Sequence, residues 1–467
     1  MDRRTFLRDL AYFSGGLAIA CSSLGNRAMA LADAPTGTVH RAYGFGDIVP
    51  TAAKNTGETF ISLPKGFEYN VIGRVNGLMS DGRPTPGAHD GMWTFKVKDQ
   101  LRIVRNHEVS NGQVPKEGSA IGSGNHYDET AGGGTTTIVI DNRTNTIVRD
   151  FVSLSGTLIN CAGGPTPWGS WITCEETTLG PTIRTNSRGV KSGGYPKPHG
   201  YCFEVPASAD SAVTPVPLKA MGRFVHEAVS FDRKGSVYLT EDNNPGGFYR
   251  FIPKKKNRLH EGGTLQMLSI EQKPEFDTRS GQTIGAKYEA AWVTIDDPDP
   301  AEADVDPLSV FKQGKAKGGA TFSRLEGCCA DKKGRIYFTS TSGGDQKAGQ
   351  IWQYEPTKRD SGILTLVYES ANRDILFMPD NICLRPKSDL LFLCEDGDYP
   401  GLESKNFLRI LDPAGRMADF ARNVSLESPR SEFAGSTFSP DGKTLFVNLQ
   451  GAGVTFAIWG DWGKFKA

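Results

Sequence analysis

The sequence lacks a charge excess of either sign and, beyond its N-terminal segment, any long apolar run. Lys and Arg together number 53 among 467 residues, and so do Asp and Glu. No overall basic field is available to attract nucleic acid, which we therefore exclude as a binding partner. After residue 30 no stretch reaches the roughly 18 continuous apolar residues of a membrane span, so we expect no integral span after processing.

Common catalytic motifs are missing as well. The chain has no nucleophile elbow, Walker loop, His-Glu-x-x-His zinc helix or Rossmann glycine fingerprint. It also lacks a clear linker, so residues 31–467 are predicted to form a single domain. What the chain has in abundance is glycine (55) and proline (27), with 10% aromatic residues. That mixture is typical of many short strands joined by tight turns.

The N-terminus carries the features of an export signal. Arg3 and Arg4 precede a short apolar segment at 10–20 and small residues at 28–30 that suit cleavage. We expect residues 1–30 to engage the twin-arginine export machinery and the mature protein to be periplasmic or secreted. Lipid attachment at Cys21 is the alternative.

The cysteine count limits the disulfide pattern. There are eight cysteines, and cleavage after residue 30 removes Cys21 and leaves an odd number. At least one cysteine is then unpaired or bound to something else.

A repeated pattern of paired strands in the sequence predicts the architecture. Four segments share an acidic or small residue, an alternating strand, a polar turn and a second apolar strand, and three of them begin 54 residues apart at Glu326, Asp380 and Ala434. A strand repeat of about 50 residues indicates propeller blades. The four segments and two weaker matches are hairpins at 226–241, 326–338, 380–395, 434–448, 90–108 and 161–176.

We therefore predict an all-β protein, a β-propeller of six blades, with seven as the variant if a less regular blade lies around 268–295. Two β-sandwiches are the rival all-β architecture. Long loops at 108–135, 180–198 and 296–320 are expected to build the active-site face.

Acidic residues recur where the blades should meet. In a propeller the inner strand of each blade starts near the axis and the next strand returns to that face. The side chains expected at this opening are Asp90, Cys161, Glu227, Glu326 and Asp380 at the strand starts, and Glu108, Glu175 or Glu176, Glu241 and Glu395 at the returns. Crowded carboxylates repel, and multivalent cations keep them ionised. Oxygen ligands suit Ca²⁺, Mg²⁺ or Fe³⁺, whereas a thiolate favours iron or zinc, so more than one metal type is predicted.

Several of these residues have structural alternatives. Glu241 and Glu395 could be turn acids that accept hydrogen bonds from loop amides. Cys161 could be a small buried apolar residue or half of a disulfide with Cys174. Glu108 could pair with Arg105.

Two histidines and one arginine complete the candidate set. His107 and His226 precede glutamates on strands, so alternation points them away from the side that the glutamates face. Arg324, two residues before Glu326, lies on the same side as that acid and suits a phosphate group. A structural ion pair is the alternative for Arg324.

The segment 160–176, Asn-Cys-Ala-Gly-Gly-Pro-Thr-Pro-Trp-Gly-Ser-Trp-Ile-Thr-Cys-Glu-Glu, resembles the PhoX family of secreted alkaline phosphatases. Further segments that share the resemblance lie at 105–108, 132–136, 199–201, 223–227, 379–381, 432–449 and 455–458. The resemblance implies a six-bladed propeller with a cluster of iron (Fe³⁺) and calcium (Ca²⁺) ions. By motif, the metal ligands would be Glu108, Cys161, Glu175, Glu227, Glu326 and Asp380, and Arg324 would grip the substrate phosphate.

The chain departs from the family pattern beside that arginine. Members with established activity are longer and carry a Pro and a Trp on either side of the following glutamate, where this chain has Arg324-Leu325-Glu326-Gly327. The chain thus resembles a shorter branch with a more open pocket.

Our hypothesis is hydrolysis of phosphate monoesters on small phosphorylated substrates, by a monomer, with Arg324 and Glu326 in catalytic roles. A calcium-dependent lactonase or esterase and a non-catalytic metal-stabilised binding propeller are the alternatives.

Overall fold

The computed structural model describes residues 44–109, 120, 124–141, 143–144, 146–185, 188–357, 360–397, 399 and 406–465. The predicted signal at 1–30, with Cys21, lies outside the described residues, as does part of the predicted loop at 108–135. Within the described residues no helix is long and apolar enough to cross a membrane.

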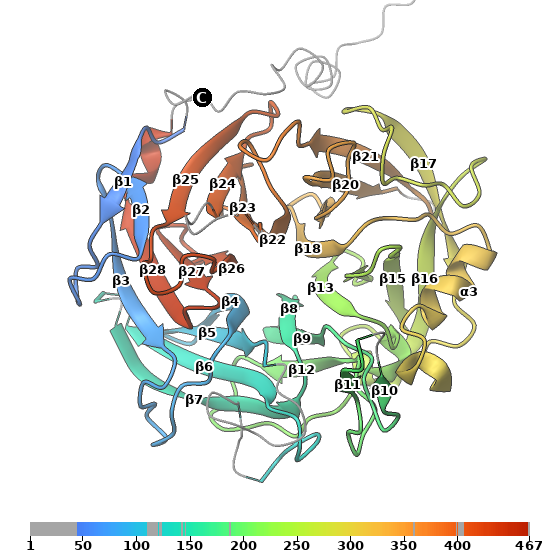
Figure 1. Ribbon diagram of the computed structural model, residues 1–467, viewed down its shortest axis with the longest axis horizontal. Helices are drawn as coiled ribbons and strands as arrows, with labels where there is room; N and C mark the ends of the chain where they lie inside the picture. The colour runs from blue at the N-terminus through green and yellow to red at the C-terminus, as the bar shows by residue number, and fades with distance from the viewer. Residues whose placement is uncertain are drawn as a thin grey trace, which may run out of the picture.

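The protein is a β-propeller, as predicted. In the described part of the chain, six inner strands contact one another in a closed ring around the axis (Figure 1). Each inner strand begins an antiparallel hairpin, and these six hairpins are the ones predicted from the sequence repeat. In chain order the inner strands are β4 (His89–Val97), β8 (Asn160–Pro165), β13 (His226–Phe231), β18 (Leu325–Ala330), β22 (Pro379–Leu384) and β26 (Phe433–Phe438).

The first three sheets continue outward from their inner strands. β4 is followed by β5 (Gln100–His107), β6 (Gly133–Asp141) and β7 (Thr146–Thr157). β8 is followed by β9 (Ser170–Glu175) and β12 (Cys202–Pro206). β13 is followed by β14 (Val237–Glu241), β15 (Phe248–Pro253), β16 (Gly263–Ile270) and β17 (Lys287–Thr294).

The other three sheets follow the same plan. β18 leads to β19 (Ile336–Ser340), β20 (Gln350–Pro356) and β21 (Gly362–Glu369), and β21 pairs with β17. β22 leads to β23 (Leu391–Glu395), β24 (Phe407–Leu411) and β25 (Met417–Asn423), and beyond these to β2 (Ile61–Pro64) and β1 (Ile48–Thr51). β26 leads to β27 (Thr444–Leu449), β28 (Val454–Gly460) and β3 (Phe67–Arg74), so that strands from both ends of the described chain share one sheet.

The residues around 268–295, expected to hold a further irregular blade, instead form outer strands. β16 pairs with β15, and β17 pairs with both β16 and β21, so no inner strand arises from this segment. The acidic segment that follows contains the short helices η3 (Ala301–Asp304) and α3 (Ser309–Ala316). The remaining short elements are β10 (Arg184–Thr185), β11 (Lys191–Ser192), η1 (Lys219–Met221), η2 (Leu259–Glu261) and η4 (Trp462–Lys464).

Local turn chemistry explains why the hairpins form. Between β13 and β14 the carboxylate of Asp232 accepts hydrogen bonds from the backbone of Lys234 (2.8 Å) and Ser236 (2.9 Å). Gly235 adopts a φ of 93°, a conformation that glycine reaches without steric strain. Asp331 makes the equivalent bonds between β18 and β19. The acid and the glycine thus fix the tight turn that the repeat predicted.

Small residues allow the inner strands to approach closely. A Cβ atom at Gly327 would lie 2.4 Å from the backbone oxygen of Asp380, and one at Gly435 would lie 2.3 Å from the backbone oxygen of Asp90. No larger side chain fits at such a distance, so neighbouring inner strands pack backbone against backbone. The residues next to these glycines are consequently held near one another at the axis.

Candidate metal centre

The six hairpins repeat one local geometry where they meet at the axis. The first residue of each inner strand is paired with the last residue of the second strand, and each ladder then shifts register within the first five residues of the inner strand. The six pairs are His89 with His107, Asn160 with Glu175, His226 with Glu241, Leu325 with Ser340, Pro379 with Glu395 and Phe433 with Leu449. A β-bulge of this kind re-aims the side chains beside it.

A backbone hydrogen bond just beyond each pair is repeated in all six hairpins. The residue after each second strand donates its N–H to the carbonyl of the residue before the inner strand. The bonds are Glu108 to Ala88 (2.9 Å), Glu176 to Ile159 (2.9 Å), Asp242 to Val225 (3.0 Å), Thr341 to Arg324 (2.8 Å), Asp396 to Met378 (2.9 Å) and Gln450 to Glu432 (3.2 Å). This bond fixes where the residue after each second strand is placed.

Four of the residues before the inner strands have a left-handed backbone. Ala88, Ile159, Arg324 and Met378 have φ values of 44°, 50°, 47° and 50°. Such a conformation costs a non-glycine residue about 1–3 kcal/mol and is characteristic of functional sites. In these four hairpins the residue before the inner strand therefore has the same backbone conformation.

These features bring acidic side chains and one thiol together at one end of the channel, which we call the mouth. Four groups of ligand atoms each lie within 4.8 Å of one another among the described residues. The groups are Cys161, Glu176 and Glu227; Asp90, Glu108 and Glu432; Glu176, Asp242 and Glu326; and Glu227, Glu326 and Asp380. We call these nine residues the axial cluster.

Five of the six ligands predicted from the sequence belong to the axial cluster. The strand starts Glu227, Glu326 and Asp380 form one group, and Glu227 is shared with the group that contains Cys161. Glu108 lies in the group with Asp90 and Glu432. The expected convergence of strand starts and strand returns is therefore present in the geometry.

Glu175, the sixth predicted ligand, does not belong to the axial cluster. Its carboxylate is fully buried and accepts hydrogen bonds from the backbone of Leu158 (2.9 Å), Gly200 (2.8 Å) and Tyr201 (3.1 Å). His199 Nδ1 lies 2.6 Å from its Oε1 atom. Glu175 thus holds the surrounding loop, and the next residue, Glu176, faces the mouth.

Glu241 and Glu395, like Glu175, are held by local hydrogen bonds and do not belong to the axial cluster. Glu241 is bound by the backbone of Gly247 (2.9 Å) and the hydroxyl of Tyr249 (2.7 Å). Glu395 accepts from Nε of the buried Arg409 at 2.9 Å. Both acids therefore have the structural role that was the alternative in the sequence interpretation.

Four acids at the mouth were missed or left undecided by sequence reasoning. Glu176, Asp242 and Asp396 each follow an acid that is paired in the ladder, so the signal was present as an acidic doublet in each case. Glu432 lies before its inner strand, at the position equivalent to Arg324, and no sequence pattern pointed to it.

The predicted orientation of the two histidines agrees with their contacts. His107 lies between the backbone oxygen of Gly87 (2.8 Å) and the hydroxyl of Thr136 (2.9 Å). His226 lies 2.9 Å from the backbone oxygen of Gly222, and its Nδ1 is 3.5 Å from Cys202 Sγ. Neither histidine is part of the axial cluster among the described residues.

Arg324 is the cation at the mouth that was predicted to bind phosphate. Its Nε atom donates to Asp242 (3.0 Å) and its Nη2 atom donates to Glu326 (2.6 Å). Among the described contacts Nη1 donates no hydrogen bond, and the side chain keeps 31% of its surface exposed. The guanidinium is thus oriented by two acids through Nε and Nη2, which leaves Nη1 as the nitrogen without a described acceptor.

The electrostatics of the axial cluster favour bound cations. Burial first, and neighbouring acids second, raise the pKa of the Asp90, Glu227 and Glu326 carboxyls well above the usual range. Burial, with Asp396 next, raises the pKa of Asp380 to about 8. Burial likewise raises the pKa of the Cys161 thiol, with Glu227 adding to it. A positive ion is the natural counterpart that lets such groups ionise.

Two buried carboxylate oxygens support the fit to metal ions. Asp90 Oδ1 and Glu227 Oε2 have no hydrogen-bond partner among the described residues. A buried acceptor without a partner is unfavourable, and nearly all such atoms in proteins are satisfied. Coordination to an ion would satisfy both oxygens, and an oxygen-rich set with one thiol suits hard cations together with a thiolate-binding metal.

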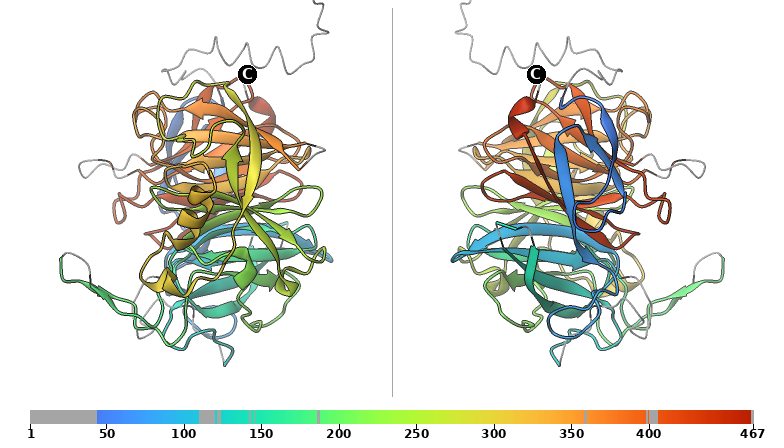
Figure 2. Two further views of the ribbon diagram at one scale, coloured as in Figure 1. Left: turned by 90° about the vertical axis from the view of Figure 1, so that its right-hand side faces the viewer. Right: turned by 90° about the vertical axis from the view of Figure 1, so that its left-hand side faces the viewer.

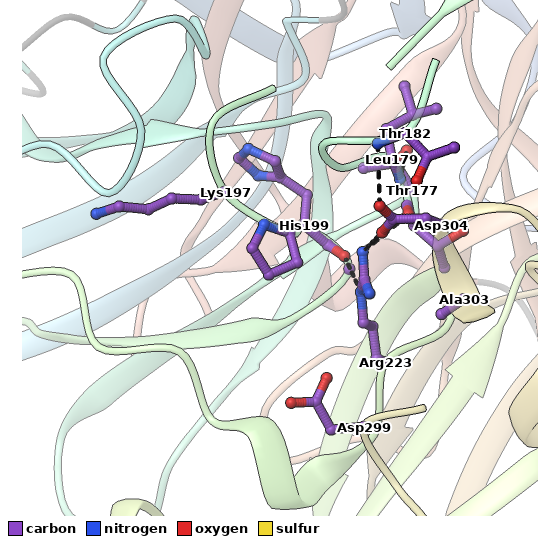
Figure 3. A network of polar contacts seen from close by, with 12 residues as sticks. Thr177, Leu179, Thr182, Lys197, His199, Arg223, Asp299, Ala303 and Asp304 are labelled. Atoms are coloured by element: carbon purple, nitrogen blue, oxygen red, sulfur yellow. Dashed lines mark hydrogen bonds and ion pairs between the residues drawn. The ribbon is translucent and has the colours of Figure 1, made fainter. Parts of the chain in front are cut away.

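A second polar network ties together the loops beside the mouth (Figure 3). Arg223 donates to the carboxylate of Asp304 and, through Nε, to the backbone oxygen of His199 at 2.9 Å. Asp304 also accepts from the backbone of Thr182 at 3.2 Å. The network thus joins the loop after β9, through Thr182 and His199, to Arg223 just before β13 and to Asp304 in η3.

The fold and the site define a class: a β-propeller with a cluster of acidic side chains and one thiol, spaced as metal ligands are, at one end of its axis. Within that class the family is shown by the sequence itself, because the profile described as alkaline phosphatase PhoX matches residues 44–453. The chain belongs to the PhoX family. No curated protein sequence matches the chain.

Solved structures with a similar fold are distant. They include a virginiamycin B lyase from Staphylococcus aureus (11% identity, 84% of this chain and 99% of that chain covered, TM-score 0.39). A gluconolactonase from Xanthomonas campestris has 9% identity, with 92% and 99% covered and a TM-score of 0.40. A protein from Bacteroides fragilis described as a putative 6-phosphogluconolactonase has 13% identity, with 92% and 91% covered and a TM-score of 0.40.

Proposed function

We propose that this protein hydrolyses phosphate monoesters at the axial cluster. Membership of a family described as alkaline phosphatases supports a phosphatase, and such enzymes depend on metal ions. The observation that carries the proposal is the convergence of Cys161, Glu227, Glu326 and Asp380 on one mouth beside Arg324.

The proposed cofactors are iron (Fe³⁺) and calcium (Ca²⁺). Cys161, Glu176 and Glu227 would hold the iron, since this is the group that contains a thiol. The all-carboxylate group of Asp90, Glu108 and Glu432 would hold calcium. When bound, these ions would withdraw charge from the phosphoryl oxygens and make water a stronger nucleophile.

Arg324 is proposed to bind the substrate. Its free Nη1 edge would donate to the non-bridging phosphoryl oxygens, and these contacts would strengthen as negative charge shifts in the transition state. Asp242 and Glu326 hold the guanidinium in this orientation through its other nitrogen atoms. Glu326 also belongs to two groups of the axial cluster, so it links the substrate-binding arginine to the metal ligands.

Location and assembly are part of the same proposal. PhoX enzymes are exported, which agrees with the paired arginines at 3 and 4 in the sequence. We propose a periplasmic or secreted monomer, exported by the twin-arginine machinery, that acts on small phosphorylated substrates.

Phosphate release from p-nitrophenyl phosphate by the metal-loaded protein tests the proposal. We expect Glu326→Gln to lower kcat at least about 100-fold, the scale seen when one group that stabilises the transition state is removed. Glu289→Gln, an exposed acid on the outer strand β17, is the matched control and should leave turnover unchanged. Full turnover in Glu326→Gln, or hydrolysis of sugar lactones in place of phosphate esters, would refute the proposal.

A further inference from the structure

Two cysteines outside the axial cluster lie side by side in one sheet. Cys174 on β9 and Cys202 on β12 are directly opposite in the antiparallel register. Their sulfur atoms are 3.6 Å apart, and both side chains are fully buried. The structure holds both as free thiols.

The position in the ladder suits a covalent link. The backbone of Glu175 donates to Tyr201 at 3.1 Å, so the adjacent pair, Cys174 and Cys202, occupies a non-hydrogen-bonded position. Opposite Cα atoms at such positions are about 4.5 Å apart, which lies within the range of about 4.4–6.8 Å found for disulfides. The two sulfur atoms can therefore bond without a large backbone movement.

The other described cysteines have no comparable partner. Among the described residues no other two cysteine sulfurs contact each other, since Cys383 is opposite Phe392 and Cys394 is opposite Leu408. Cys161 faces the axial cluster with Glu176 and Glu227. The odd number of cysteines left after removal of Cys21 is consistent with one pair and a separate thiol ligand.

We propose that Cys174 and Cys202 form a disulfide bond in the exported protein. Each thiol loses a proton, the two sulfurs join, and the two electrons pass to a disulfide oxidant such as oxidised glutathione, which is reduced to two thiols. β12 is the outermost described strand of its sheet, so local opening of this edge gives the oxidant access to both buried thiols.

The bond would stabilise the loop segment that carries Glu176, a residue of the axial cluster. It closes the segment between β9 and β12, which contains Glu176 and the projecting hairpin β10–β11 (Figure 2). In the described residues this sheet has three strands, whereas each of the other inner strands leads a sheet of four or more. Closing a loop of this length should change the equilibrium constant of unfolding by roughly 400-fold.

A non-reducing peptide map tests the assignment. The full-length protein is produced in an oxidising compartment, purified without reductant, denatured in an alkylating agent and digested. We expect one cross-linked peptide that joins Cys174 to Cys202, and alkylated thiols elsewhere. Recovery of both residues as alkylated thiols overturns the proposal, and so does a link between Cys174 and Cys161, which would also remove the thiol from the proposed metal site.

Unfolding with and without reductant gives an independent readout. Reduction should favour unfolding of the unaltered protein roughly 400-fold and should have no effect on Cys174→Ala or Cys202→Ala. Cys383→Ala, a fully buried cysteine in another sheet, is the matched control and should keep the sensitivity to reductant. Equal sensitivity in all three variants overturns the proposal, and the peptide map of the unaltered protein decides the matter if a variant does not fold.

Discussion

Replacing Glu175 and Glu176 with glutamine, one at a time, separates a structural role from a proposed metal-binding role. Glu175 accepts three backbone hydrogen bonds and contacts His199, all within a fully buried site. In Glu175→Gln one carboxylate oxygen becomes an NH₂ group that faces N–H donors. Two hydrogen bonds to a charged acceptor are then lost, each worth about 1.5–3 kcal/mol, so we expect destabilisation of about 3–5 kcal/mol.

Glu176→Gln should have the opposite profile. Burial, followed by the nearby Glu108, Asp242 and Glu326, raises the pKa of the Glu176 carboxyl well above its usual range. Removing this charge relieves repulsion in the metal-free protein, so the free energy of unfolding should change by less than about 1 kcal/mol. Metal binding should fall sharply because two groups of the axial cluster lose a ligand.

Denaturant unfolding in the presence of chelator, and metal content after reloading, measure the two effects separately. The expected result is a lower unfolding midpoint only in Glu175→Gln and a lower metal content at unchanged metal-free stability only in Glu176→Gln. If Glu175→Gln unfolds within about 1 kcal/mol of the unaltered protein, or Glu176→Gln retains its full metal content, the reasoning about this doublet fails.

Three further predictions concern the arginines and the ions. Arg324→Lys should lower kcat/KM about 10- to 100-fold with metal content unchanged, because an ammonium group cannot reproduce the guanidinium fork; steady-state kinetics with elemental analysis checks this. Arg409→Met leaves the buried Glu395 without its cation and should cost about 3–5 kcal/mol of stability, whereas Arg143→Met, in an exposed pair, should cost at most about 1 kcal/mol; denaturant unfolding compares them. Chelation should lower the melting temperature and restoration of metal should recover it, because ions that bind the folded state alone stabilise it; calorimetry that shows no shift would contradict this.

The repeat in the sequence was sufficient to predict the propeller and the convergence of acidic strand starts at one end of its axis. The hairpins that begin at Glu227, Glu326 and Asp380 start where the acidic or small residue precedes an apolar strand, as expected. The prediction of a further blade around 268–295 was wrong because the two strands there, β16 and β17, extend an existing sheet. Sequence spacing alone does not distinguish an outer pair of strands from a new blade.

The identity of individual ligands was harder to predict because the ladders are irregular beside the mouth. In a regular hairpin the paired residue itself would face the channel, which placed Glu175, Glu241 and Glu395 at the opening and favoured Glu175 as a ligand. Each hairpin instead has a register shift near the start of its inner strand, and the next residue, such as Glu176 or Asp242, reaches the axis. The sequence pattern of the hairpins does not reveal this register shift.

Elemental analysis of the purified protein, combined with its visible absorption spectrum, tests most directly whether the axial cluster binds metal ions. We predict bound iron and calcium, a thiolate-to-iron absorption band that disappears in Cys161→Ser, and loss of iron in Glu227→Gln. Protein that is folded and purified without chelator, yet contains no multivalent cation and has no such band, would contradict it.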